Sequence, residues 1–347
     1  MSVYINSTSL ISPQKTFDST IASEGKLVHS GVRLNCIEPN YAELIDPKAI
    51  RRMSRIIRMG VAAGKTAVKK AGIEHPDAII VGTAFGCLED THSFISRMTE
   101  YNEDMLNPTP FIHSTHNTIA GQIALHFKCH GYNSTYVHRS VSFESALIDG
   151  FMQVQEGAVG NALIGGTDEL IDASFTIMDR MGFYRKGASE LPFDLNDASG
   201  KGTVAGEGAG YFMISGKPSG DHPVQINCVE QFSHLNPEEA ASQFQKISSG
   251  KYDLILSGHN GDSVNDRIID SMTDIVAPGT ASYKFKQLCG EYPTATAFAL
   301  WLATEIASKQ LSLSSLDASV PVDQDFKNIL VINQSGGIHY SFISISA

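Results

Sequence analysis

Apolar residues along the chain gather in short runs that end in glycine, and longer stretches of small and apolar residues separate these runs. In the first part of the chain the order is an apolar run over residues 77–86 (DAIIVGTAFG), a helix-like stretch over 142–157 (SFESALIDGFMQVQEG) and a second run over 161–166 (NALIGG). Short apolar runs bounded by turn residues are typical of buried strands, whereas longer periodic stretches favour a helix. The pattern therefore predicts a strand, a long helix and a second strand.

The same order returns in the second part of the chain, offset by roughly 150–175 residues. Here the strand-like runs cover residues 253–261 (DLILSGHNG) and 328–337 (NILVINQSGG), and the helix-like stretch covers 294–309 (TATAFALWLATEIASK). Strands that alternate with helices indicate a layered α/β fold, and two packed halves would bury both helices. Many α/β proteins repeat the order of strand, helix and strand without a duplicated sequence, so this similarity alone does not show that the two halves arose by duplication.

The most polar connection between the two groups of segments is KPSGDHP at residues 217–223, which proline and glycine punctuate. We therefore expect a division there, into an N-terminal half over residues 1–216 and a C-terminal half over 217–347. At 347 residues the chain could hold two or three average domains, but single α/β domains also reach this size. Length alone does not decide between these possibilities.

Composition places the chain among soluble globular proteins, because 42% of its residues are hydrophobic and 18% are charged. No apolar run approaches the roughly 18 residues of a membrane helix, and the first residues do not resemble a signal peptide, so we expect a cytoplasmic protein. The five cysteines are odd in number, scattered and free of any CxxC pair. Neither a disulfide framework nor a zinc site is indicated.

The net charge of −11 makes nucleic acid an unsuitable partner, because specific nucleic-acid binding normally needs a basic surface. One basic cluster stands out, with spacing that would place several guanidinium groups together on a helix: Arg51, Arg52, Arg55 and Arg58. Such a cluster could meet an acidic protein or could simply be a solvated helix face. The sequence leaves both interpretations open.

Four segments carry a more specific pattern of motifs. In PFDLNDASGKGTVAGEGAGYFMI, residues 192–214, a Pro-Phe-Asp triplet precedes a glycine-rich run. Three other segments are RRMSRIIRMGVAAG at 51–64, the stretch that contains Asn117, Ala120 and Gly121, and NALIGGTDE at 161–169. In this order and spacing the four segments resemble the β-ketoacyl-acyl carrier protein synthase family, the ketosynthases, over nearly the whole chain.

This resemblance implies an α/β fold of the thiolase type, with five layers in the order αβαβα and two similar halves. It implies acyl carrier protein thioesters as ligands, no cofactor and no metal. It also implies a homodimer, or a heterodimer with an active ketosynthase, through the segment around residues 105–140. Family members pair edge strands beside the nucleophile, and HGYNSTYV at residues 130–137 reads as such a strand.

The active site of the family, as the resemblance implies, holds a cysteine nucleophile at the start of a buried helix, two histidines and a lysine. Counting back 25 residues from Gly165, as the family spacing requires, places Ser140 at the position of the cysteine. His259 matches the first histidine, although its motif is one residue short. Lys286 matches the lysine, and Glu291 replaces the second histidine.

Four further residues match positions that the resemblance assigns to substrate binding. Asn117 lies in the Asn-x-x-Ala-Gly match. Ser335, Gly336 and Gly337 lie in NQSGG, which resembles the loop that normally contains a gating phenylalanine. Because this loop is two residues shorter here, we expect the gate to be absent or different.

The replacements at the nucleophile and at the second histidine change the chemistry. A serine hydroxyl is far less acidic than a thiol, so Ser140 needs a general base. A carboxylate at Glu291 opposes the enolate that condensation develops, and losing one oxyanion donor typically costs about 2.7–4 kcal/mol. We therefore expect no normal condensation by this chain alone.

Two hypotheses about function remain. In the first, the chain is a chain-length-factor-like partner of an active ketosynthase in fatty-acid or type II polyketide biosynthesis. In the second, it is an acyltransferase or hydrolase of carrier-protein thioesters, with Ser140 as nucleophile, His259 as base and Glu291 as the orienting acid of a triad. We favour the first, because His259 and Glu291 stand at positions of another chemistry and a triad requires hydrogen bonds that residue types do not establish.

Overall fold

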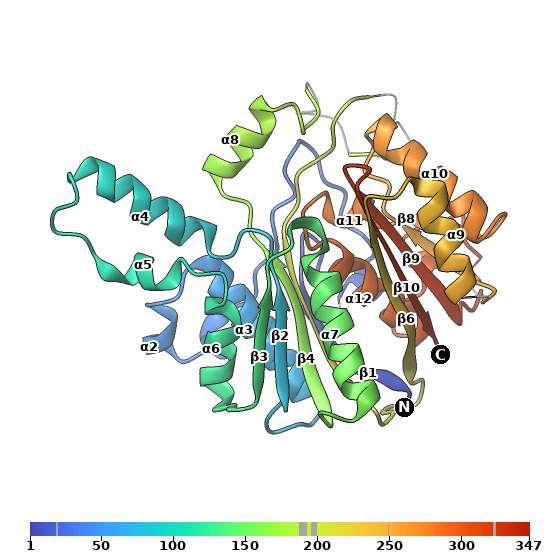
Figure 1. Cartoon of the computed structure of the whole chain (residues 1–347), viewed down its shortest axis with the longest axis horizontal. Coiled ribbons are helices and arrows are strands. Elements are labelled where there is room, and N and C mark those ends of the chain that lie inside the picture. The colour runs from blue at the N-terminus through green and yellow to red at the C-terminus, as the bar shows by residue number, and fades with distance from the viewer. Residues whose placement is uncertain (19, 187–192, 196–199, 249, 322–323) are drawn as a thin grey trace.

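The computed structural model describes residues 1–18, 20–186, 193–195, 200–248, 250–321 and 324–347 (Figure 1). Its strands are β1 (Val3–Ile11), β2 (Ala78–Gly82), β3 (Tyr132–Tyr136), β4 (Asn161–Asp168), β5 (Gly208–Ser215), β6 (Val224–Ser233), β7 (Leu254–Ser257), β8 (Ser282–Lys284), β9 (Asn328–Ser335) and β10 (His339–Ser346).

The helices are α1 (Ile21–Glu24), α2 (Pro47–Ile50), α3 (Arg55–Lys70), α4 (Leu88–Glu100), α5 (Pro108–His113), α6 (Thr118–Phe127), α7 (Ser142–Glu156), α8 (Asp172–Arg180), α9 (Pro237–Ile247), α10 (Ser263–Val276), α11 (Lys286–Cys289) and α12 (Thr296–Ala307). Short 3₁₀ helices are η1 (Tyr41–Glu43), η2 (Arg139–Val141) and η3 (Leu313–Ser315). None of the helices in the described part of the chain is long and apolar enough to cross a membrane.

The strands follow one another in a repeated order. Across the sheet the order is β3-β2-β4-β5-β1-β6-β10-β9-β7-β8, so each half of the chain contributes five strands in the same arrangement. In both halves the second strand runs parallel to the third and fourth, and the fifth runs antiparallel to the fourth and the first. The two sets join where β1 pairs with β6. The strand order therefore shows two similar halves.

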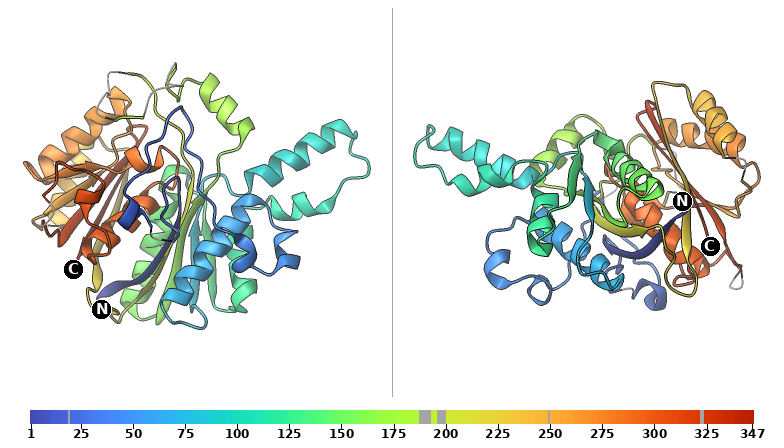
Figure 2. Two further views of the ribbon diagram at one scale, coloured as in Figure 1. Left: turned by 180° about the vertical axis from the view of Figure 1, so that it is seen from behind. Right: turned by 60° about the horizontal axis from the view of Figure 1, so that its bottom comes forward.

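Five layers result from the way in which the helices cover the two sets of strands (Figure 2). Helices α7 and α12 lie in the middle, because each packs against strands of both halves. Helices α3 and α6 cover the outer face of the first set, and α9 and α10 cover that of the second. All but one of the residues of α12 are buried, which explains its almost uninterrupted run of apolar and small residues.

The predicted strand, helix and strand of each half are confirmed as β2, α7 and β4 and as β7, α12 and β9. Of the four arginines in the basic cluster, Arg55 and Arg58 share α3, whereas Arg51 and Arg52 lie in the turn before it. Arg55 and Arg58 turn inward, toward Glu207 and the Tyr41 ring. The domain division at residue 217 stays a prediction, which the repeated strand order supports.

One pair of helices projects away from the layered body. Figure 1 shows α4 and α5 extending from the body as an arm, and none of their residues is buried. Its exposed apolar side chains are Ile95, Tyr101, Met105, Phe111 and Ile112. We call residues 88–113 the arm.

Candidate functional site

Ser140 lies in η2, directly before α7, at the entrance to the middle layer. Its side chain is half-buried. The Ser142 hydroxyl fixes the turn, because it accepts a hydrogen bond from the His138 N–H at 2.8 Å and donates to the Arg139 carbonyl at 2.6 Å. The predicted nucleophile thus lies directly before a largely buried helix, where the family resemblance places it.

His259 follows β7 and is only 8% exposed. One ring nitrogen lies 3.0 Å from the Ser257 hydroxyl, and the other lies 3.0 Å from a carboxylate oxygen of Asp270 on α10. These two contacts engage both nitrogens of the imidazole. In this arrangement His259 has no nitrogen left to act as a base toward Ser140.

Lys286 and Glu291 form an ion pair beside His259. Lys286 is 1% exposed, and its ammonium group donates to Glu291 Oε2 at 2.8 Å. The amide of Asn260, the residue after His259, donates to the same oxygen at 2.7 Å. The position of the second family histidine therefore holds an oxygen that accepts two hydrogen bonds, whereas a condensing site needs donors there.

The glycine-rich strand positions this ion pair. The Gly206 N–H donates to the Glu291 carbonyl at 2.9 Å. A Cβ on Gly206 would lie 2.0 Å from the carbonyl oxygen of Cys289, so only glycine lets the two segments approach this closely. The motif that carried the family resemblance thus sets the place of Glu291.

The predicted triad is not formed. His259 bonds Ser257 and Asp270, and Glu291 bonds Lys286 and Asn260, so among the described residues no hydrogen bond joins Ser140, His259 and Glu291 to one another. The three residue types suit a triad, but the side chains of His259 and Glu291 form hydrogen bonds with other neighbours instead.

The four predicted substrate-binding residues lie in two separate places. Asn117 is the exposed N-cap of α6, in the outer layer. Ser335, Gly336 and Gly337 form the tight turn from β9 to β10, in which both glycines have positive φ and the Ile338 N–H donates to the Ser335 carbonyl at 3.1 Å. The turn itself explains the two glycines, because its backbone needs positive φ at both positions. Contact of any of the four residues with substrate stays a prediction.

Sequence reasoning did not assign a role to two residues that order the His259 loop. Asp266 is buried and accepts from the backbone N–H groups of Asn260 and Gly261. Asp270 bonds His259 from one helical turn further along α10. The spacing of the two aspartates on α10 was the available signal, since residues four apart share a helix face.

The middle layer also contains polar groups that the predicted site does not use. Glu144 on α7 is fully buried, and one of its oxygens accepts from the Ser341 hydroxyl at 3.0 Å while the other has no partner among the described residues. Burial raises the pKa of the Glu144 carboxyl, so its neutral form is favoured. Asn333 on β9 donates to Thr296 at the start of α12 at 2.9 Å.

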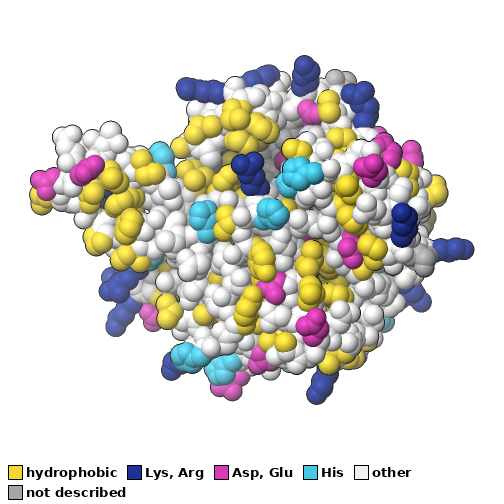
Figure 3. Space-filling view, viewed as in Figure 1, with side chains coloured by type: hydrophobic (Ala, Val, Ile, Leu, Met, Phe, Trp, Pro, Cys, Tyr) yellow, Lys and Arg dark blue, Asp and Glu magenta, His cyan; other side chains and the backbone are white. Residues whose placement is uncertain are grey.

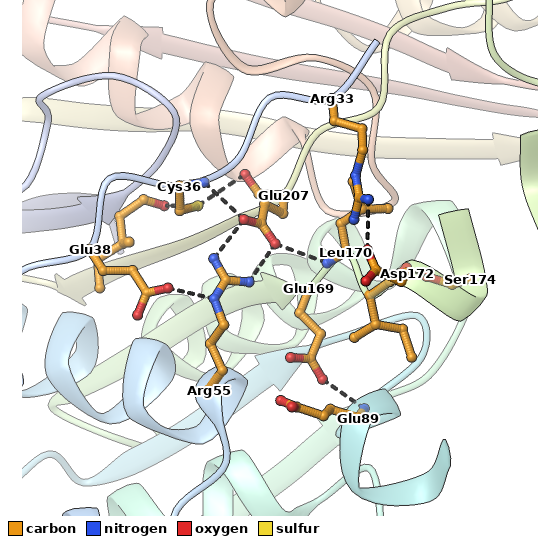
Figure 4. Close-up of polar contacts among 12 residues, drawn as sticks. Arg33, Cys36, Glu38, Arg55, Glu89, Glu169, Leu170, Asp172, Ser174 and Glu207 are labelled. Atoms are coloured by element: carbon orange, nitrogen blue, oxygen red, sulfur yellow. Dashed lines mark hydrogen bonds and ion pairs between the residues drawn. The ribbon is translucent and has the colours of Figure 1, made fainter. Parts of the chain in front are cut away.

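A second ion pair joins two of the motifs that carried the resemblance (Figure 4). Glu207, in the GEGAG run, is fully buried and accepts both terminal nitrogens of Arg55 at 2.6 Å. The backbone N–H groups of Cys36 and Leu170 complete its shell, at 2.8 and 2.9 Å. Glu207 therefore holds together the basic segment, the chain that follows β4 and the glycine-rich run.

Two neighbouring carboxyls at the end of β4 have no basic partner in hydrogen-bond contact. Burial raises the pKa of Asp168 to about 6 and that of Glu169 to about 7. Glu169 accepts the Glu89 N–H at 3.0 Å, and its other oxygen has no partner among the described residues. In the part of the chain that the structure describes, no group of histidine, cysteine or acidic side chains could hold a metal ion.

Comparisons with known proteins agree with this architecture. The profile described as "Beta-ketoacyl synthase, N-terminal domain" matches residues 9–218. No curated protein matches the chain. Among solved structures, the chain is similar to "The ishigamide ketosynthase/chain length factor", with a TM-score of 0.81 at 14% identity, over 100% of this chain and 99% of that one.

Two further solved structures are similar over the whole chain. One is a Beta-ketoacyl synthase from Burkholderia phymatum STM815, with a TM-score of 0.80 at 15% identity and 99% of that chain covered. The other is the ketosynthase ApeO in complex with its chain length factor ApeC from Xenorhabdus doucetiae, with a TM-score of 0.76 at 18% identity and 98% covered. At these identities the structures confirm the predicted thiolase-like fold of two similar halves. With the profile match over most of the chain, they lead to one conclusion: this chain belongs to the β-ketoacyl synthase family.

Proposed function

We propose that this chain is a non-condensing partner of an active ketosynthase, similar to a chain length factor, in fatty-acid or type II polyketide biosynthesis. One observation carries the proposal: Glu291 Oε2 accepts hydrogen bonds from Lys286 and Asn260 where condensation requires a donor to an enolate. Ser140 stands where the family has its thiol, and His259 is engaged elsewhere. Three of the groups that condensation uses are therefore changed or occupied.

The free edge of β3 offers a place for the partner. Strand β3 stands at one end of the strand order, so only β2 pairs with it among the described strands. The Tyr136 carbonyl accepts from Thr83 beyond β2, so the N–H and carbonyl of Thr135 point to the open edge because strand groups alternate. Unpaired strand edges pair readily with another chain. We propose that an edge strand of the ketosynthase pairs here.

The arm adds apolar area beside this edge. Ile95, Phe111 and Ile112 are more than half exposed, and Met105 at its tip is 93% exposed. Most soluble proteins bury their large apolar side chains, so a group of exposed ones typically marks a surface that another molecule contacts. A ketosynthase partner that covers the arm and continues the sheet from β3 accounts for both features.

Two similar structures are complexes. ApeO was solved with its chain length factor, and a fourth similar structure is described as "AntDE:AntF (apo): type II PKS acyl-carrier protein in complex with its ketosynthase bound to the hexaketide". By analogy we propose acyl carrier protein thioesters as the ligands of the assembled pair, and the cytoplasm as its location.

The partner proposal is tested by co-expressing the chain with the ketosynthase encoded beside it and measuring the mass of the purified complex by light scattering. We expect a one-to-one complex. Thr135→Pro removes the outward N–H and should abolish the complex, whereas Thr135→Val keeps this N–H and should preserve it. A chain that stays monomeric in every mixture, or a Thr135→Pro variant that still pairs, contradicts the proposal.

The acyltransferase or hydrolase alternative is tested on Ser140 itself. Incubation with an acyl-carrier thioester should leave the peptide that contains Ser140 without added mass, because no base among the described residues hydrogen-bonds to its hydroxyl. In the complex, Ser140→Ala should leave product formation by the ketosynthase nearly unchanged. Acylation of Ser140 that disappears in Ser140→Ala and in His259→Ala would establish the alternative instead.

A further inference from the structure

Three histidines and an arginine meet on the surface beside Ser140. His138 and Arg139 precede Ser140 in the chain, His234 follows β6, and His339 begins β10. The ring centroids of His138 and His339 are 5.8 Å apart, and those of His234 and His339 are 6.1 Å apart. We call these four residues the histidine cluster. It does not belong to the family motifs or to the Lys286–Glu291 pair.

Hydrogen bonds fix where the histidine cluster lies. A ring nitrogen of His339 is 2.8 Å from the hydroxyl of Ser233, its register partner on β6. The His234 N–H donates to the Ile338 carbonyl at 2.9 Å, which ties the end of β6 to the turn before β10. A ring nitrogen of His138 lies 3.5 Å from the Ser145 hydroxyl on α7. Elements of both halves thus bring the rings together.

The backbone is strained at two of the four positions. Arg139 has a φ of 50° and His234 a φ of 61°. A left-handed conformation is unfavourable for a residue other than glycine, and such residues gather at functional sites and ligand clamps. The strain therefore supports a functional reason for the cluster.

The charges around the cluster favour an anion. Burial, and then the neighbouring His138, His234 and Arg139, lower the pKa of His339, so it lacks a negative neighbour. On the inner face of β10, Glu144 bonds Ser341, two residues along the strand from His339, and the raised pKa of Glu144 favours its neutral form. Glu238 acts on Tyr340, which lies on the opposite face of β10 because side chains alternate.

We propose that the histidine cluster is a binding site for an oxyanion, a phosphate or a carboxylate, next to Ser140. An arginine and imidazolium N–H groups donate charge-assisted hydrogen bonds to such oxygens. Figure 3 shows histidine and basic side chains close together beside a hollow on the face that carries α7, so the site is open to a ligand. His138, Arg139 and His234 are exposed, and His339 is half-buried.

This site does not depend on a partner subunit or on reaction at Ser140. A chain that fails to pair with a ketosynthase would still bind the anion, and a chain that pairs would not thereby establish the site. The two proposals can therefore fail separately.

The test is titration of the purified chain with inorganic phosphate and with malonate, followed by NMR of the histidine ring nitrogens at constant ionic strength in chloride. We expect one of the two anions to bind more tightly at pH 6 than at pH 8, and to raise the pKa of His339. Loss of one charge-assisted hydrogen bond should weaken binding about tenfold in Arg139→Gln and in His339→Gln. The control His75→Gln, on an exposed histidine before β2, should bind as the wild type does.

Which of the two anions binds shows the chemical class of the natural ligand. Saturable binding of phosphate alone indicates a phosphate ester, and saturable binding of malonate alone indicates a carboxylate on the carried group. The proposal is overturned if neither anion shifts the cluster resonances, or if His75→Gln weakens binding as much as His339→Gln does.

Discussion

Two carboxylates near the centre of the molecule, Glu207 and Glu291, each pair with one basic side chain, and their surroundings differ. Glu207 accepts two hydrogen bonds from the Arg55 fork and two from backbone N–H groups, and no part of it reaches water. Glu291 accepts from Lys286 and Asn260 through one oxygen, and 28% of its side chain is exposed. The first pair joins motifs that resemble the family, and the second stands where the family has a histidine.

The difference separates a pair that holds distant segments of the fold together from a pair at the candidate site. A planar guanidinium and a fully satisfied carboxylate make a rigid contact between distant segments. An ammonium and a half-exposed carboxylate make a contact that a change of one residue can create or remove. The fold can therefore be kept while the chemistry of the site is replaced.

The largest effect should follow from breaking the first pair. Arg55→Met leaves Glu207 buried without its cation, which typically costs about 3–5 kcal/mol. Urea unfolding, followed by circular dichroism, measures the loss. Lys186→Met, which breaks an exposed pair with Asp179, should cost less than about 1 kcal/mol and serves as the control. Equal losses in the two variants would remove the distinction between the buried pair and an ordinary surface pair.

Glu169 sharpens the comparison, because it is buried near Arg55 without a cation of its own. Its pKa is raised from 4.5 to about 7, so the folded protein binds more protons than the unfolded chain between these values. The stability that the protonated group contributes is present below pH 4.5 and is lost as the pH rises through 7, by about 3 kcal/mol. Glu169→Gln should remove this part of the pH dependence in unfolding measured from pH 4 to pH 8. An unchanged pH profile would contradict the assignment.

Breaking the Lys286–Glu291 pair should destabilise the protein less than breaking the Arg55–Glu207 pair does. The loss should also depend on which of the two residues is replaced. Glu291→Gln leaves the ammonium of Lys286 buried without an anion and should cost about 2 kcal/mol. Lys286→Met leaves a carboxylate that water partly solvates, so it should cost less. If the double variant loses as much as the sum of the two single variants, the pair is not coupled. Unfolding of the three variants in urea decides this.

The smallest effect concerns His339, outside both pairs. Its lowered pKa means that the folded protein binds fewer protons than the unfolded chain just below pH 6.5, so stability falls as the pH falls through this value. His339→Gln should flatten the profile between pH 7 and pH 5 by less than about 1 kcal/mol, because solvent screens the group. If stability fell more steeply with falling pH in the variant than in the wild type, the lowered pKa of His339 would be contradicted.

The fold could be read from the sequence to the level of paired strands and helices, and the family resemblance supplied the layers. Apolar periodicity identifies β2, α7 and β4 because burial on both faces leaves little choice of residue there. The strand order could not be read in this way, since β1 pairs with residues far along the chain. Periodicity carries no information about such distant partners.

Sequence reasoning named candidate residues of the site but not their contacts. Family spacing matched Ser140, Lys286 and Glu291 to site positions, and the structure places Ser140 directly before α7 and joins the other two in an ion pair. The partners of His259 could not be predicted, because local geometry decides which side chains reach its two ring nitrogens, and these are Ser257 and Asp270. The histidine cluster was missed because its members come from three segments that only the folded chain brings together.

The position of β1 has a consequence for how the chain is made. Tyr4 pairs with Ser215, about 200 residues further along, so β1 lacks this neighbour until the rest of the first half has been synthesised. At about 5–20 residues per second, this delay lasts roughly 10–40 s. Throughout that time the apolar strand next to the junction of the two halves is exposed. We therefore expect slower translation to prolong the exposure of β1 before it pairs with β5.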